Sequence, residues 1–378
     1  MMTEHPNVKG LYIHIPFCNK ICNYCDFFKI VASEKFINEY CKYLIKELES
    51  KKEFFKKLKT IYIGGGTPSS LSKENLSRIF EKLQEIIDFN NIIEFTIEAN
   101  PLDITLSFLD LLIVNKVTRL SIGVQSFDNY KLSVLGRKHT FNDLFKMFNL
   151  LRKKKLKISC DLIYGLKKDN FKNFKKDIVY LLKNRVKHIS LYALSLEEKT
   201  IFMKEFEKKN FEILSDDDLF KIYQKSSNFL KKKGFIHYEI SNFGKKEHFS
   251  EHNLLYWNNE NYLGIGCAAS SHLDLVRYTN PKKFKDYYEI IEFNSSKYYE
   301  YENLTVEESM KEEVILNLRK RTGIDTVAFY NKYKKNIFMI FPNINKIIQE
   351  KLLTYKNNHI FIPESKFYIS NYIINMII

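Results

Sequence analysis

The sequence predicts an α/β protein built on a partial, TIM-like (β/α)6 barrel, with an additional α/β segment and a small C-terminal domain. From residue 10 to about 194, short β-rich apolar runs alternate with longer helical patterns, and no Pro- or Gly-rich linker interrupts this half. Such alternation is typical of βα units that build a parallel sheet. With 378 residues and 45% hydrophobic content, the chain is long enough for a large core or for more than one domain.

Six strands are predicted in the first half, each a short apolar run rich in β-branched or aromatic residues. They cover residues 10–16, 60–64, 92–98, 119–125, 157–164 and 188–194. Between them, apolar residues recur at spacings of three and four, which predicts helices such as 36–58, 73–89 and 141–155.

The pattern is less regular after residue 194. We expect a helix over 216–233, a strand over 237–243 and a loop-rich stretch over 244–280. A helix over 307–319 precedes the stop signal Thr322-Gly323, and β-like residues follow at 355–362. The predicted domains are therefore a barrel core (1–200), a barrel extension (201–300) and a small C-terminal domain (301–378).

Cys18, Cys22 and Cys25 form a CxxxCxxC run directly behind the first predicted strand, in a chain with only six cysteines. Three thiolates on one loop can hold three irons of a [4Fe-4S] cluster and leave the fourth iron open. A closed zinc site is the alternative, and its fourth ligand would have to be a residue such as His14 or Cys160. A thioredoxin-like redox pair is a further alternative.

Polar and glycine-rich residues follow the other predicted strands, at the edge where a parallel barrel gathers its chemistry. They are Gly64, Gly65, Gly66 and Thr67 after the second strand, Glu98 after the third, Gln125 on the fourth and Asp161 on the fifth. Glycines let a backbone approach a small molecule closely. Each residue alone also fits an ordinary turn or a solvated strand end. Together with Arg137, one of eight arginines, they predict a polar pocket beside the cysteines.

Composition argues against two other classes of function. The net charge of +15 comes mostly from lysines scattered along predicted helices, which is typical of solvated faces rather than a nucleic-acid surface. No apolar stretch approaches 18 residues and the start carries no apolar signal region, so neither membrane spanning nor secretion is predicted. A reducing cytoplasm would keep the thiols free for a metal.

With these motifs, the chain resembles the radical S-adenosylmethionine superfamily, and within it the branch of oxygen-independent coproporphyrinogen III oxidases and HemW-type heme chaperones. The resemblance rests on residues 12–18, 61–68, 121–126 and 312–319. It implies a radical SAM barrel and a HemN-like C-terminal domain. In such proteins, S-adenosylmethionine chelates the open iron, and an electron from the cluster can release a 5′-deoxyadenosyl radical.

The resemblance also implies roles for individual residues. Cys18, Cys22 and Cys25 correspond to the cluster ligands. The residues that correspond to the S-adenosylmethionine pocket are Tyr12, Gly65, Gly66, Thr67 and Glu98. In the oxidase, the residues matching Gln125, Arg137 and Asp161 contact a second S-adenosylmethionine, or its ribose and carboxylate.

Several features resemble the chaperone more than the oxidase. Phe27 stands where the oxidases carry a fourth Cys, and only nine residues precede Gly10. Residues 252–257 match the HNxxYW motif of HemW proteins, which implies that His252 binds heme. Ser270 replaces a His found in many relatives, so Cys267 and His272 are further candidates for the heme ligand.

The expected function is that of a cytoplasmic heme chaperone. It would bind a [4Fe-4S] cluster, S-adenosylmethionine and heme, take electrons from a small redox protein and transfer heme to an acceptor protein. The first alternative is an oxygen-independent coproporphyrinogen III oxidase, an oxidoreductase of porphyrin synthesis, and the second is a zinc-stabilised binding protein.

Overall fold

The computed structural model describes residues 6–378 and contains the predicted parallel sheet. Its first six strands pair in parallel in chain order. They are β1 (Gly10–Ile15), β2 (Thr60–Gly65), β3 (Glu94–Ala99), β4 (Arg119–Gln125), β5 (Lys157–Tyr164) and β6 (His188–Ala193). Each lies within two residues of the run that predicted it.

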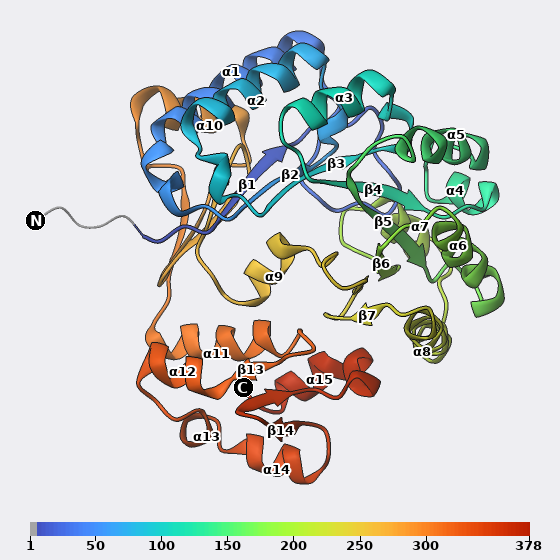
Figure 1. Ribbon diagram of the computed structural model, residues 1–378, viewed down its shortest axis with the longest axis vertical. Helices are drawn as coiled ribbons and strands as arrows, with labels where there is room; N and C mark the ends of the chain where they lie inside the picture. The colour runs from blue at the N-terminus through green and yellow to red at the C-terminus, as the bar shows by residue number, and fades with distance from the viewer. Residues whose placement is uncertain (1–5) are drawn as a thin grey trace, which may run out of the picture.

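Helices cover the outer face of these strands (Figure 1). They are α1 (Glu34–Ser50), α2 (Lys73–Ile86), α3 (Leu106–Val114), α4 (Asn129–Val134), α5 (Phe141–Leu151) and α6 (Phe171–Lys183). Ser, Thr, Asp or Asn caps every one of their N-termini and satisfies a backbone N–H that the helix itself cannot. The helix predicted over 36–58 is shorter, because the chain tightens into a 3-10 turn at Lys52–Lys57.

Side chains alternate along each strand between the helices and the barrel interior. On β3, Phe95 and Ile97 are fully buried in the core under the helices, whereas Thr96 and Glu98 line a central cavity. On β5, Cys160 belongs to the core, whereas Ser159 and Asp161 face the cavity. The barrel interior is therefore polar.

The segment after β6 extends the sheet on both sides. Following α7 (Ile201–Glu207) and α8 (Asp216–Lys232), β8 (Asn242–Gly244) pairs antiparallel with β6 and with β7 (Ile236–His237). On the other side, β9 (Tyr262–Ile265) pairs parallel with β1. Beyond it lie β10 (Ser270–Leu273), β11 (Val276–Thr279), α10 (Phe284–Phe293) and β12 (Glu300–Asn303), which complete a 12-stranded sheet.

Two expectations for this segment were wrong. The strand predicted over 237–243 is a hairpin of β7 and β8, and Glu239 between them pairs instead with Lys320 of the C-terminal region. The stretch 244–280, predicted to be loop-rich, contains α9 (Glu251–Trp257) and three short strands. Short runs of this kind obtain their structure from tertiary pairing, which local pattern does not report.

The C-terminal region contains five helices and a separate antiparallel sheet, and it lies beside α9 (Figure 1). Its elements are α11 (Val306–Asn317), β13 (Ile324–Asp325), α12 (Thr326–Tyr333), α13 (Ile337–Ile340), α14 (Asn343–Gln349), β14 (Thr354–Lys356), β15 (His359–Phe361) and α15 (Ser370–Asn375). Asn357 and Asn358, both with positive φ, turn β14 into β15, as two-residue hairpin loops require.

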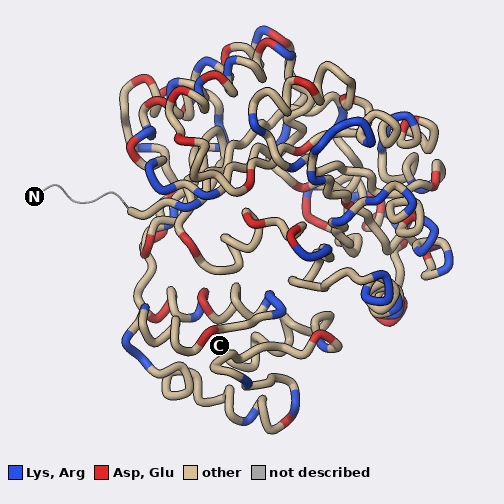
Figure 2. The backbone as a smooth tube through the Cα atoms, in the orientation of Figure 1, with Lys and Arg blue, Asp and Glu red and all other residues tan. Residues whose placement is uncertain are grey.

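Basic and acidic residues are interspersed over the outer helices and loops (Figure 2). No helix within residues 6–378 combines the length and apolar character needed to cross a membrane.

Candidate functional site

A cavity of about 370 Å³ runs from the carboxyl ends of the parallel strands into the barrel interior. Most of the predicted site residues line it, although they come from separate strands and loops. They are Cys18, Cys22, Cys25, Gly65, Gly66, Thr67, Glu98, Gln125, Arg137 and Asp161. The rule that parallel strands gather chemistry at their carboxyl ends thus accounts for the position of this site.

The cysteine loop leaves β1 and is tied back at both ends. The Cys18 N–H donates to the Ile30 carbonyl at 3.0 Å, and the Ile30 N–H donates to the Pro16 carbonyl at 2.7 Å. All three thiols are free and only partly buried. Arg137 donates to the Cys22 sulfur at 3.4 Å, and the Thr67 hydroxyl lies 3.4 Å from the Cys18 sulfur. The guanidinium and the hydroxyl can both stabilise the negative charge of a thiolate, which is the form of cysteine that binds a metal.

This donor set fits three ligands of a cluster better than a closed zinc site. The His14 ring contacts the Tyr12 hydroxyl through Nδ1 and the Phe28 carbonyl through Nε2, both at 2.9 Å. Cys160 lies in the core, on the face of β5 that points away from the cavity. Neither residue is therefore placed to complete a tetrahedral site with the loop cysteines. Within the described chain, no three His, Cys, Asp or Glu side chains form a single-ion site.

Glu98 and the glycine segment form the adjacent wall. The Glu98 carboxylate accepts from the Tyr62 hydroxyl at 2.6 Å and from the Gly65 N–H at 3.2 Å. Gly65 has a φ of +114°, and a Cβ there would lie 2.6 Å from the His14 ring, so glycine is required. Burial raises the pKa of Glu98 to about 7, while the Tyr62 hydrogen bond opposes the rise. A carboxylate held this way is suited to a cationic or hydroxyl-bearing ligand.

Gln125 of β4, Asp161 of β5 and Arg137 continue the cavity wall beside Glu98 of β3. Arg137 is largely committed to the protein, since its Nη2 donates to the Asn100 side chain at 2.6 Å and to the Gly123 carbonyl at 2.9 Å. Gln125 has a φ of +64°, and its buried Oε1 has no hydrogen-bond partner. Burial raises the pKa of Asp161 to about 6. Gln125 and Asp161 therefore offer acceptor oxygens to the cavity.

Tyr12 does not line the cavity. Its hydroxyl contacts His14, and its ring stacks on Tyr62 with centroids 6.2 Å apart. Tyr62 was not predicted, because a tyrosine within a strand is an ordinary β-forming residue. The period of two would have indicated it, since Tyr62 shares a strand face with Gly64.

His252, the expected heme ligand, is buried and does not line the cavity. His252 has no exposed surface, and its Nδ1 and Nε2 contact the Thr60 hydroxyl at 2.7 Å and the Tyr256 hydroxyl at 2.9 Å. Thr60 begins β2, whereas the glycine segment ends it, so His252 lies at the barrel end opposite the cysteine loop. Both imidazole nitrogens therefore have protein partners in this structure.

The other candidate heme ligands are also engaged. The Cys267 thiol is fully buried and donates to the Pro281 carbonyl at 2.9 Å. His272 contacts the Asp274 carbonyl through Nε2 at 3.0 Å. The Ser270 hydroxyl pairs with that of Thr279 at 2.8 Å.

Comparison with known proteins agrees with the fold and the cysteine motif. The family model of the Radical SAM superfamily matches residues 12–181, and that of the HemN C-terminal domain matches residues 304–365. The E. coli coproporphyrinogen III oxidase (HemN), a solved structure, superposes with a TM-score of 0.84 at 22% identity. It covers 99% of this chain and 91% of its own. At that identity the likeness shows the fold.

Two curated relatives match almost end to end. The heme chaperone HemW of Lactococcus lactis subsp. lactis (strain IL1403) is 36% identical over 98% of this chain and 97% of its own length. The heme chaperone HemW of Bacillus subtilis (strain 168) is 35% identical over 93% of each. The chain therefore belongs to the HemW family of radical S-adenosylmethionine proteins.

Proposed function

We propose that this protein is a heme chaperone that binds a [4Fe-4S] cluster, S-adenosylmethionine and heme and passes heme to an acceptor protein. One observation carries the proposal. The three loop thiols, the glycine segment and Glu98 line a single cavity, in a chain 36% identical over 98% of its length to a curated heme chaperone.

In this proposal Cys18, Cys22 and Cys25 hold the cluster. When bound, the cluster supplies one-electron chemistry and an open iron for the amine and carboxylate of S-adenosylmethionine. Arg137, which donates to the Cys22 sulfur, offsets the negative charge of the thiolates. The Thr67 hydroxyl orients Cys18.

The remaining cavity residues bind the organic part of S-adenosylmethionine. Gly65 and Gly66 let the backbone approach it closely, while Glu98 accepts from a cationic or hydroxyl group. Gln125 and Asp161 accept from its hydroxyls. Tyr12 acts indirectly, because it holds His14, which in turn contacts the Phe28 carbonyl of the cysteine loop. A small redox protein supplies electrons, and the reducing cytoplasm keeps the thiols free.

An oxygen-independent coproporphyrinogen III oxidase is the second candidate, because Gln125, Arg137 and Asp161 all face the cavity. Phe27 favours the chaperone. It stands where the oxidases carry a fourth Cys, and its side chain is 65% exposed at the cavity rim, which gives the rim an apolar surface in place of a thiol.

The test uses protein purified without oxygen. Iron and sulfide analysis should find a [4Fe-4S] cluster that is lost in Cys22→Ser, and the wild type should take up heme stoichiometrically. The same preparation, given coproporphyrinogen III, S-adenosylmethionine and a strong reductant, should form no protoporphyrinogen IX. Turnover there would assign the oxidase instead, and stoichiometric zinc without sulfide would overturn both proposals.

A further inference from the structure

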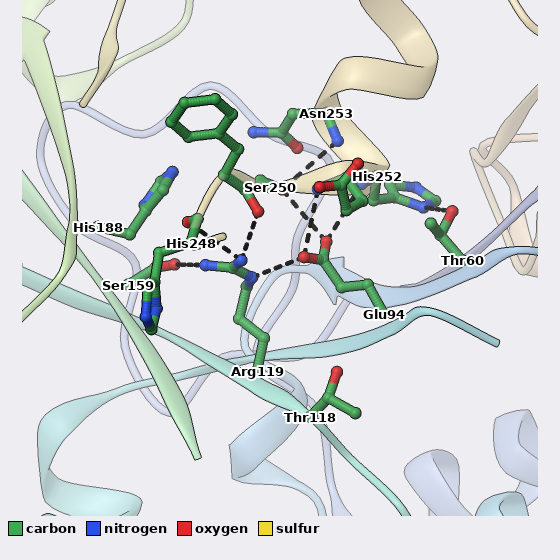
Figure 3. Close-up of polar contacts among 12 residues, drawn as sticks. Thr60, Glu94, Thr118, Arg119, Ser159, His188, His248, Ser250, His252 and Asn253 are labelled. Carbon is green, nitrogen blue, oxygen red and sulfur yellow. Dashed lines mark hydrogen bonds and ion pairs between the residues drawn. The ribbon is translucent and has the colours of Figure 1, made fainter. Parts of the chain in front are cut away.

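The HNxxYW motif lies on α9. A buried ion pair between Glu94 and Arg119 holds the start of this helix at the floor of the barrel, which is the end opposite the cysteine loop (Figure 3). The Glu94 carboxylate accepts from the N–H groups of Glu251 at 3.2 Å and His252 at 3.1 Å. Arg119 donates to Glu94 at 2.9 Å and to the Phe249 carbonyl at 2.6 Å. These contacts use backbone groups, so the position of α9 depends little on the imidazole of His252.

The imidazole instead contacts the second strand. Its Nδ1 pairs with Thr60, the first residue of β2, and its ring stacks on Tyr62 with centroids 5.1 Å apart and planes 27° apart. Tyr12 stacks on Tyr62 as well, at 6.2 Å and 28°. Two aromatic neighbours, one of them His252, thus restrict the orientation of the Tyr62 ring.

Tyr62 in turn contacts the residues of the cavity wall. Its hydroxyl donates to one oxygen of Glu98 at 2.6 Å, and the other oxygen accepts from the Gly65 N–H at 3.2 Å. A Cβ on Gly64 would lie 2.7 Å from the Tyr62 ring, so the ring packs directly against the glycine segment. A shift of Tyr62 would therefore disturb both Glu98 and this wall of the cavity.

We infer that His252 is a positioning residue for the S-adenosylmethionine pocket, which holds Tyr62 so that Tyr62 orients Glu98, rather than a ligand of heme. The inference rests on the proposed function only in assigning S-adenosylmethionine to the cavity. Through His252, the HNxxYW motif would then connect the floor of the barrel with the cavity wall that contains Glu98.

The test measures S-adenosylmethionine binding to the reconstituted holoprotein by equilibrium dialysis, and heme uptake in parallel. His252→Ala removes the ring that supports Tyr62, and Tyr62→Phe removes the hydroxyl that Glu98 accepts from. Each should weaken S-adenosylmethionine binding about tenfold, the size expected for a lost hydrogen bond to a charged group. Because His252 acts through Tyr62, the double variant should bind hardly less tightly than either single variant. Heme stoichiometry should not change.

Two further variants separate positioning from a general loss of stability. His252→Phe keeps the stacked ring without its nitrogens, and it should retain most of the S-adenosylmethionine affinity. His237→Ala is the matched control, because His237 is also fully buried and stacked, on Phe243 at 4.0 Å, but lies on the edge strand β7, several strands away from Tyr62 and Glu98. It should lower the melting temperature without changing the affinity.

The outcomes distinguish this inference from the proposed function. If His252→Phe and His252→Ala both lose heme while S-adenosylmethionine affinity stays at the wild-type value, His252 is a heme ligand and the inference is wrong. Additive losses in the double variant would also overturn it. Failure of the wild type to take up heme would instead count against the chaperone.

Discussion

Glu98 shows how one side chain can be suited to a ligand at the expense of stability. It is surrounded by protein but faces the cavity, and no lysine or arginine is paired with it in the described structure. Its pKa of about 7 lies above the ordinary value of 4.5 because burial disfavours the charged form. A cationic ligand in the cavity would therefore offset the free energy that is lost by burying the Glu98 carboxylate.

This arrangement predicts a pH-dependent stability without cofactors. Since the folded state binds the Glu98 proton more tightly than the unfolded chain, the contribution of Glu98 to stability falls as pH rises from about 5 to about 7. Glu98→Gln should match the wild type near pH 5 and exceed its free energy of unfolding by about 2 kcal/mol at pH 8. Urea unfolding at the two pH values measures the difference. A constant difference between the two proteins would contradict the assignment.

Much of the site could be predicted from single residues because the relevant signals are local. The CxxxCxxC spacing, the glycine segment and the acids each adjoin a recognisable strand, and parallel strands bring their ends together. The packing of His252 could not be predicted in this way. Its neighbours Thr60 and Tyr62 are some 190 residues distant in sequence, and a motif identifies a residue without telling which nitrogen contacts which hydroxyl.

Helix α9 owes its place to the ion pair between Glu94 and Arg119 rather than to its own sequence. It has seven residues, too few for an isolated helix to be stable. Both charges are almost fully buried, and Arg119 makes further hydrogen bonds to Ser159 and to the His248 carbonyl. A buried pair of this kind is costly to break from one side, because the remaining charge stays buried without its counterion.

Arg119→Met should therefore lower the free energy of unfolding by about 3–5 kcal/mol, because it leaves the Glu94 carboxylate buried without its cation. Urea denaturation followed by far-UV circular dichroism measures this change. Glu292→Gln is the matched control, since it breaks the exposed pair with Lys46 and should change the same quantity by less than about 1 kcal/mol. Equal effects of the two substitutions would show that Arg119 is not needed to anchor α9.

The molecule as a whole is joined through the other end of α9. Trp257, its last residue, lies beneath the Arg319 guanidinium at 5.7 Å, and Lys320 donates to Asn258. Asn259 donates to Glu313 of α11 at 3.2 Å. One short helix is thus anchored to the barrel at its start and to the C-terminal region at its end. Local pattern could not indicate this arrangement, because it depends on contacts between segments far apart in sequence.

Trp257 is the only tryptophan of the chain, so its fluorescence reports on this junction alone. Arg319→Ala should shift its emission to longer wavelength, because the ring loses the side chain that covers it and gains contact with water. The far-UV circular dichroism should not change, since α11 ends before Arg319 and the guanidinium contacts α15 only through the Asn371 side chain. Arg152→Ala is the control, as Arg152 is exposed and contacts Asn149 and Asn184 instead. An unshifted emission in Arg319→Ala would place the C-terminal region away from Trp257 in solution.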